Sequence, residues 1–184
     1  MRKLIFNKNP ILHTSIINDK KENIADISYP MIISTKSREG TDSGKNGIWK
    51  GKTTIDGCII KIGDTTCNLF RTYKTDKQFL ANNYIDNIMI GQEKVFTAQE
   101  DRISSFTIYK PTITFIKNNQ NYEFYNKSLI PFRYELRSNN VTIGVFENRK
   151  FLSLLPSYIF EVYDDSISDA EMIYLYAMIN RHIA

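Results

Sequence analysis

The stretch SDAEMIYLYAMINRHIA, residues 168–184, decides the fold. Ser168 and Glu171 have the spacing of a capping box, in which each side chain accepts a hydrogen bond from an amide at the start of a helix. The sequence therefore predicts a helix over about 169–183. Residues 172–179 carry no charge, so this helix is apolar nearly all the way round. Because a surface helix keeps a polar face, this one must be surrounded by protein or lie in lipid.

About fifteen residues make a helix roughly 22 Å long, which is short for a membrane span and comparable with the height of a closed sheet. Upstream, roughly a dozen segments alternate polar and apolar residues between turns, which predicts a mainly antiparallel β domain. That many strands can close into a barrel too wide for its own side chains to fill, and the helix would fill it. The alternative is a helix packed across one face of a sandwich, with its second face covered by a loop or a partner. The clearest strand candidates are 2–6, 11–17, 24–29, 31–35, 47–52, 57–62, 66–73, 103–110, 112–117, 121–125, 132–137, 141–146, 149–155 and 158–163.

The connections between these segments differ in kind. Residues 117–120, 138–140 and 147–148 contain Asn, which tolerates positive φ, and predict hairpin turns. Residues 36–46 contain no apolar side chain and predict a long loop. Segment 75–102 fits both helix and strand, and we expect it to be mixed.

Composition limits the class of protein. Of 184 residues, 42% are hydrophobic and 24% charged, with a formal net charge of +4, which is typical of a single globular domain over 1–184. No apolar run reaches the ~20 residues of a membrane span, and the first residues turn polar too early for a signal peptide, so we expect a cytoplasmic protein without a transmembrane segment. There, Cys58 and Cys67 are expected to be free thiols, with Cys67 the more exposed. A disulfide across adjacent strands is the alternative.

The C-terminal third has a recognisable order. Segment 158–165, YIFEVYDD, leads through Asp169 into the apolar helix, after hairpin segments at 132–137, 141–146 and 149–155. This order resembles the tubby C-terminal-like superfamily, particularly its small LURP-one-related and phospholipid-scramblase-like members. The resemblance implies a closed twelve-stranded barrel with the last helix running through it. It also implies a non-enzymatic binding or regulatory role, since tubby binds phosphoinositides. The proline-rich, palmitoylated and calcium-binding segments of true scramblases have no counterpart in this sequence.

Basic residues on the predicted strands are the candidate binding site. Alternation puts Lys50 and Lys52 on one face of their strand, and Arg133 and Arg137 on one face of theirs. If these strands are neighbours, their side chains form an outer positive patch for lipid phosphates or an acidic protein partner. The simpler interpretation is a set of solvated strand faces that also carry glutamates. The candidates are Lys50, Lys52, Arg133, Arg137, Arg149 and Lys150.

No catalytic or cofactor motif stands out. The two histidines, His13 and His182, are far apart in the sequence, and no glycine-rich phosphate loop occurs, so we expect neither an enzyme nor a bound cofactor. Four acidic residues near the helix start could hold a divalent ion, but stabilisation of the helix N-terminus explains them more simply, so no metal is expected. Nucleic acid is not an expected partner, because the net charge is small. The four acids are Glu161, Asp164, Asp165 and Asp169.

These observations lead to one expectation and one alternative. We expect a non-enzymatic cytoplasmic binding module that recognises anionic lipid head groups at a membrane surface, as the resemblance implies. The alternative is a module for a protein partner, such as an immunity protein or inhibitor that neutralises a toxin or an enzyme. The 11 Tyr and 11 Phe residues would suit such an interface wherever they are exposed.

Overall fold

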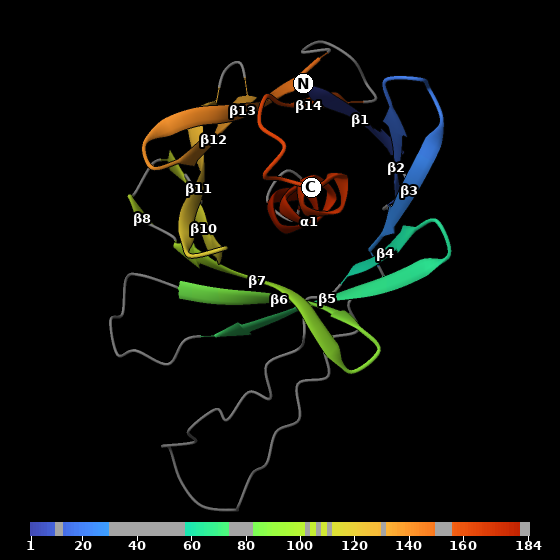
Figure 1. Ribbon diagram of the computed structural model, residues 1–184, viewed down its shortest axis with the longest axis horizontal. Coiled ribbons are helices and arrows are strands. Elements are labelled where there is room, and N and C mark those ends of the chain that lie inside the picture. The colour runs from blue at the N-terminus through green and yellow to red at the C-terminus, as the bar shows by residue number, and fades with distance from the viewer. Residues whose placement is uncertain are drawn as a thin grey trace, which may run out of the picture.

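Twelve strands close into one antiparallel barrel around helix α1, as Figure 1 shows. The computed structural model describes residues 1–9, 13–29, 58–73, 83–101, 104–105, 108–109, 112–129, 132–149 and 156–180. The elements are β1 (Arg2–Asn9), β2 (His13–Asn18), β3 (Asn23–Ser28), β4 (Cys58–Ile62), β5 (Thr65–Tyr73), β6 (Asn83–Ile90), β7 (Glu93–Asp101), β8 (Ser104–Ser105), β9 (Ile108–Tyr109), β10 (Thr112–Lys117), β11 (Gln120–Leu129), β12 (Phe132–Ser138), β13 (Val141–Asn148), β14 (Ser157–Val162) and α1 (Asp169–Asn180). The predicted closed barrel with a C-terminal helix is confirmed.

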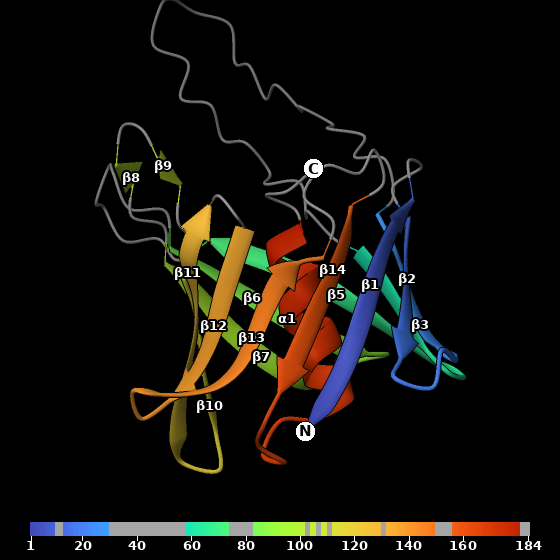
Figure 2. The same cartoon turned by 90° about the horizontal axis from the view of Figure 1, so that it is seen from above.

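The two ends of the barrel have different connections. Each barrel strand pairs with its neighbours along the chain, β1 pairs with β14 to close the ring, and β8 and β9 form a separate two-stranded sheet. We call one end the turn end, because short connections and the segment leading into α1 lie there (bottom of Figure 2). We call the other end the loop end. Its connections, in sequence order, are 10–12, 29–57, 74–82, 102–111, 130–131, 149–156 and, after α1, 181–184.

The tight turns follow the predicted turn chemistry. Asn118 and Asn119 have φ of 50° and 61°, and Asn139 and Asn140 have φ of 48° and 67°, so both predicted Asn turns are confirmed. The third predicted turn, at 147–148, is wrong. Both of its residues belong to β13, where Glu147 pairs with β12 and β14, because a single Asn within an otherwise alternating run does not interrupt a strand.

Alternate strand residues and α1 together fill the barrel. All nine residues of Met172–Asn180 are buried. On one side of the helix, Phe6 stacks on Tyr176 with ring centroids 4.2 Å apart. On the other, the rings of Tyr174 and Phe96 lie 5.7 Å apart. The helix therefore has apolar strand residues on opposite sides, as expected for a helix inside a barrel and not for one lying across a sandwich.

The largest correction concerns 75–102. Its described part is not mixed but a β-hairpin, β6–β7. In the described part of 103–110, the predicted single strand is replaced by the short strands β8 and β9. The predicted strands 31–35, 47–52 and most of 149–155, and the predicted loop 36–46, lie outside the described residues.

Candidate functional site

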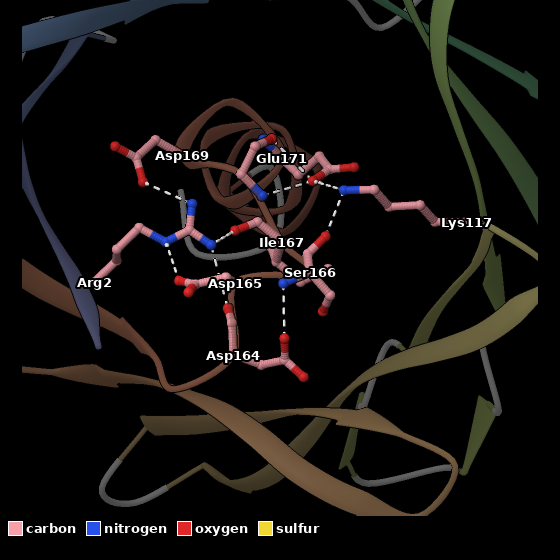
Figure 3. A network of polar contacts seen from close by, with 9 residues as sticks. Arg2, Lys117, Asp164, Asp165, Ser166, Ile167, Asp169 and Glu171 are labelled. Atoms are coloured by element: carbon pink, nitrogen blue, oxygen red, sulfur yellow. Dashed lines mark hydrogen bonds and ion pairs between the residues drawn. The ribbon is translucent and has the colours of Figure 1, made fainter.

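The turn end is closed by contacts between β1 and the segment leading into α1 (Figure 3). The Arg2 guanidinium donates hydrogen bonds to the backbone oxygens of Asp164 and Ile167. It also lies 3.8 Å from a carboxylate oxygen of Asp165 and from one of Asp169. The acids at this end therefore anchor the start of the helix to the first strand.

A second anchor comes from β10. The Lys117 ammonium donates to the backbone oxygen of Ser166 and to the Glu171 carboxylate, at 2.7 Å for the latter (Figure 3). The predicted capping box is present: the Ser168 amide donates to Glu171 at 2.7 Å, and the Glu171 amide donates to the Ser168 hydroxyl at 3.3 Å. Each of these bonds satisfies an amide or a charge that the helix start would otherwise leave unpaired.

The four acids weighed as a cation site each contact a protein group, and Asp165 and Asp169 share Arg2. Glu161 accepts a bond from Lys3 at 2.7 Å on the outside of the barrel, and Asp164 accepts one from the Ser166 amide at 2.7 Å. Among the described residues, no group of three or more His, Cys, Asp and Glu side chains is placed to hold a metal ion. These acids take part in the contacts that join the segment before α1 to the neighbouring strands at the turn end.

The loop end has a buried charged cluster inside the barrel. Arg71 on β5 donates to both carboxylate oxygens of Asp86 on β6, at 2.8 and 2.7 Å, and to Glu100 on β7. The three residues are 6%, 1% and 1% exposed. The guanidinium also lies over the Tyr84 ring, 4.8 Å from its centroid. In a low-dielectric interior this bidentate pairing is what makes the burial of three charges tolerable.

Polar groups from the opposite side of the loop end face the same interior. Asn126 on β11 is 6% exposed, and neither its amide nitrogen nor its amide oxygen has a hydrogen-bond partner among the described residues. It is directly opposite Tyr134 on β12. Burial raises the pKa of the Tyr134 hydroxyl, the nearby Asn126 amide opposes that rise, and the negative charge of Glu100 adds to it. The interior of the barrel is thus polar at the loop end, whereas the interior around α1 is apolar.

None of the three residues of the charged cluster was among the site residues predicted from the sequence. The cluster could have been predicted from the spacing of its acids along their strands. Asp86 is two residues from Tyr84 and from Ile88, and Glu100 is two and four residues from Ala98 and Phe96, so each acid lies on the same inward face as these buried residues. A charge in such a place requires a partner on a neighbouring strand, and the only inward basic residue on β5 to β7 is Arg71 among those described.

The predicted basic residues that are described lie on the outside of the barrel, as alternation requires. Arg133, near the loop end of β12, lies 3.6 Å from a carboxylate oxygen of Glu147 and is half-exposed. Arg149 is exposed at the loop end, just after β13. Arg137 lies toward the turn end of β12 and donates to Glu135 at 3.0 Å. The structure therefore brings Arg133 and Arg149 to one end of the barrel and places Arg137 nearer the other.

Glu135 is the centre of an ordered group on this outer face. It accepts bonds from the Tyr125 hydroxyl at 2.6 Å and from Arg137, and Lys127 lies 3.8 Å away. The Arg137 guanidinium stacks over the Tyr125 ring, 4.1 Å from its centroid. The bond from Tyr125 is the main cause that lowers the pKa of Glu135, with Arg137 and Lys127 adding to it against partial burial. Burial and the neighbouring carboxylate raise the pKa of Tyr125 to about 12.

The remaining predicted basic residues lie outside the described residues but belong to loop-end connections. Lys50 and Lys52 are part of 29–57, and Lys150 is part of 149–156. The chain has 24 basic residues (Lys and Arg) and 20 acidic residues (Asp and Glu). The described residues include 13 of the basic and 16 of the acidic ones, which gives them a formal charge of −3. The residues outside the described ranges include the other 11 basic and 4 acidic residues, which gives them a formal charge of +7. All of that excess belongs to connections that begin and end at the loop end, or follows α1 there.

The cysteines and the described histidine show no catalytic arrangement. Cys58 and Cys67 are not joined by a disulfide, and both are buried, which corrects the expected exposure of Cys67. Its sulfur lies 3.6 Å from the hydroxyl of Tyr174 on α1, because alternation on β5 turns it inward. His13 lies 3.3 Å from a carboxylate oxygen of Asp26, on the outside of β2 and β3.

The candidate site is therefore the loop end, with its exposed arginines, its polar interior and its basic connections. Among the described residues, no helix is long and apolar enough to span a membrane. No family model, curated protein or solved structure matches this chain.

Proposed function

We propose that this protein is a non-enzymatic binding module that recognises anionic lipid head groups with the loop end of its barrel. The observation that carries the proposal is the separation of charge between the part of the loop-end connections that lies outside the described residues, at +7, and the described residues, at −3. A molecule with a total charge of only +4 can in this way present a strongly basic end. The resemblance to tubby-like domains supports the same class of ligand.

The size of the effect suits reversible binding. A Lys or Arg close to an anionic membrane contributes about 1 kcal/mol, so an end with a net excess of several cations reaches a useful affinity without a deep pocket. The interaction falls off over a Debye length of about 8 Å at physiological ionic strength. Binding should therefore weaken steeply as salt is added.

Vesicle co-sedimentation tests the proposal. The protein should sediment with phosphatidylcholine vesicles that contain phosphatidylserine or a phosphoinositide, should be released at high salt, and should not sediment with phosphatidylcholine alone. The double variant Arg149→Glu with Lys150→Glu should bind much less. Lys61→Glu with Lys94→Glu, which makes the same charge change at exposed positions near the turn end, is the matched control and should bind almost as the wild type does. A wild type that ignores anionic vesicles at low salt, or a control as weak as the loop-end variant, contradicts the proposal.

A protein partner is the second candidate, and exposed apolar side chains at the turn end favour it. Val141 at the start of β13 is 64% exposed, and Tyr163 just after β14 is 52% exposed. Both belong to the same end of these two neighbouring strands, because the Tyr163 amide donates to the backbone oxygen of Ile143, two residues beyond Val141. A stoichiometric protein retained at high salt by the wild type and lost from Tyr163→Glu would support this candidate.

A further inference from the structure

One wall of the barrel lacks outward charges. On the adjacent strands β5, β6, β7 and β10, the outward side chains that the structure describes are uncharged, apart from Glu93 and Lys94 at the start of β7. Amides and hydroxyls alternate there with apolar groups, and the Thr97 hydroxyl donates to the Asn87 amide oxygen at 3.0 Å. These positions are Thr66, Asn68, Phe70, Ile85, Asn87, Met89, Thr97, Gln99, Thr112, Thr114 and Ile116.

The opposite wall differs sharply. On β11 to β14 the outward positions carry paired ions, among them Arg133 with Glu147 and Arg137 with Glu135. In Figures 1 and 2, β6 and β7 lie across α1 from β13 and β14, so the charged and uncharged walls face opposite directions. Large apolar side chains are also exposed on the uncharged wall: Ile116 is 72% exposed and Phe70 is 36% exposed.

We propose that the uncharged wall, defined by the eleven positions above, is the interface through which two copies of this chain associate. Protein interfaces are depleted of charge at their centre, because an ion buried between two proteins loses its hydration. Of the walls built from described residues, this is the one that a second copy can cover without desolvating an ion. This inference does not depend on the lipid-binding proposal.

The chemistry of the wall suits an identical partner in particular. In a two-fold dimer the same patch faces itself, so the patch must be complementary to itself. Hydroxyl and amide groups meet that condition, because each can both donate and accept a hydrogen bond. Charge also favours association through the uncharged wall over association through the loop end, because two loop ends of like charge repel each other.

The size of the wall sets the expected strength. A standard interface uses about 20–30 residues on each side, and the wall has eleven outward positions, so the dimer should be weak and should dissociate in the micromolar range. Four strands about 4.8 Å apart make it roughly 19 Å wide, which is enough for a continuous contact.

Sedimentation velocity over the micromolar range tests the inference. The weight-average sedimentation coefficient of the wild type should rise with concentration from the monomer value toward that of a dimer. Phe70→Arg with Thr97→Arg should remain monomeric at every concentration. Thr114→Arg, a single change on the same wall, should weaken association at least tenfold, and it replaces the double variant should that one fail to fold by circular dichroism.

The matched control makes the same kind of change on another wall. Ser15→Arg with Ile17→Arg substitutes one hydroxyl and one apolar residue at outward positions of β2, and it should associate as the wild type does. Three results would overturn the inference: a wild type that stays monomeric throughout, a variant of the uncharged wall that dimerises normally, or an equal loss of association in the control.

Discussion

At position 86 an aspartate faces the interior of the barrel, 1% exposed, and pairs with Arg71 on the neighbouring strand. This one residue makes strand β6 hard to recognise in the sequence. The outward Ile85 and the inward Asp86 reverse the polarity that a half-buried strand normally shows, so the alternation that identifies other strands fails here. The charge is tolerated because the Arg71 guanidinium on β5 pairs with it, and Arg71 lies 15 residues away in the sequence.

The buried charges give a prediction at the residue scale. Arg71→Met should destabilise the protein by about 3–5 kcal/mol, because it leaves the Asp86 and Glu100 carboxylates buried without the guanidinium that pairs them. Urea unfolding followed by circular dichroism measures the change. Arg149→Met, at an exposed position, is the control and should change stability by less than about 0.5 kcal/mol. Equal unfolding midpoints for the two variants would show that the cluster contributes no stability.

Glu135 gives a second residue-scale prediction, on pH. Its pKa is lowered in the folded protein, so its contribution to stability is complete above the ordinary value of a glutamate and is lost as the pH falls through the lowered value. Glu135→Gln should therefore be less stable than the wild type at pH 7, and the difference should shrink as the pH falls below about 4.5. Urea midpoints between neutral and acid pH measure it, with the outward Glu123→Gln on β11 as the control. A difference that stays constant over this range would contradict the assignment.

At the scale of elements, helix α1 organises the fold. Its apolar sequence fits a position inside the barrel, the capping box and the contacts of Arg2 and Lys117 hold its start, and the rings of Tyr174 and Tyr176 contact opposite sides of the barrel. The buried apolar residues of the strands and residues 172–179 of this helix belong to one core cluster. Loss of its packing should therefore unfold the whole domain and not only one edge.

A charge in the helix tests its position. Ile173→Asp should abolish folding, because an unpaired charge inside the barrel costs several kcal/mol against a total stability of about 5–15 kcal/mol. The same is expected of Leu175→Asp. Ala170→Asp is the control: it lies in the first turn of α1, half-buried, where a negative charge favours the helix dipole. Near-ultraviolet circular dichroism should show native packing for the control alone, and a folded Ile173→Asp protein would mean that the helix is not central.

At the scale of the whole molecule, sequence reasoning recovers what local patterns encode. The apolar helix, its cap, the closed mainly-β architecture and the two Asn turns are all readable, because each depends on neighbours within one element. The β6–β7 hairpin and the charged cluster are not, because the inward Asp86 and Glu100 are explained only once Arg71, from another strand, lies beside both of them. The separation of charge between the loop-end connections and the described residues appears only when the strand order shows that the basic connections all meet the barrel at the same end.

The central claim, that the loop end meets an anionic surface, can be tested through Trp49. This is the only tryptophan, and it belongs to the connection 29–57, which begins and ends at the loop end. Its fluorescence should be quenched when the protein binds vesicles of phosphatidylserine and brominated phosphatidylcholine, and quenching should disappear at high salt or without phosphatidylserine. Sedimentation of the same samples establishes that the protein is bound. Vesicle-bound protein with unquenched Trp49 fluorescence, or no binding at low salt, would contradict the claim.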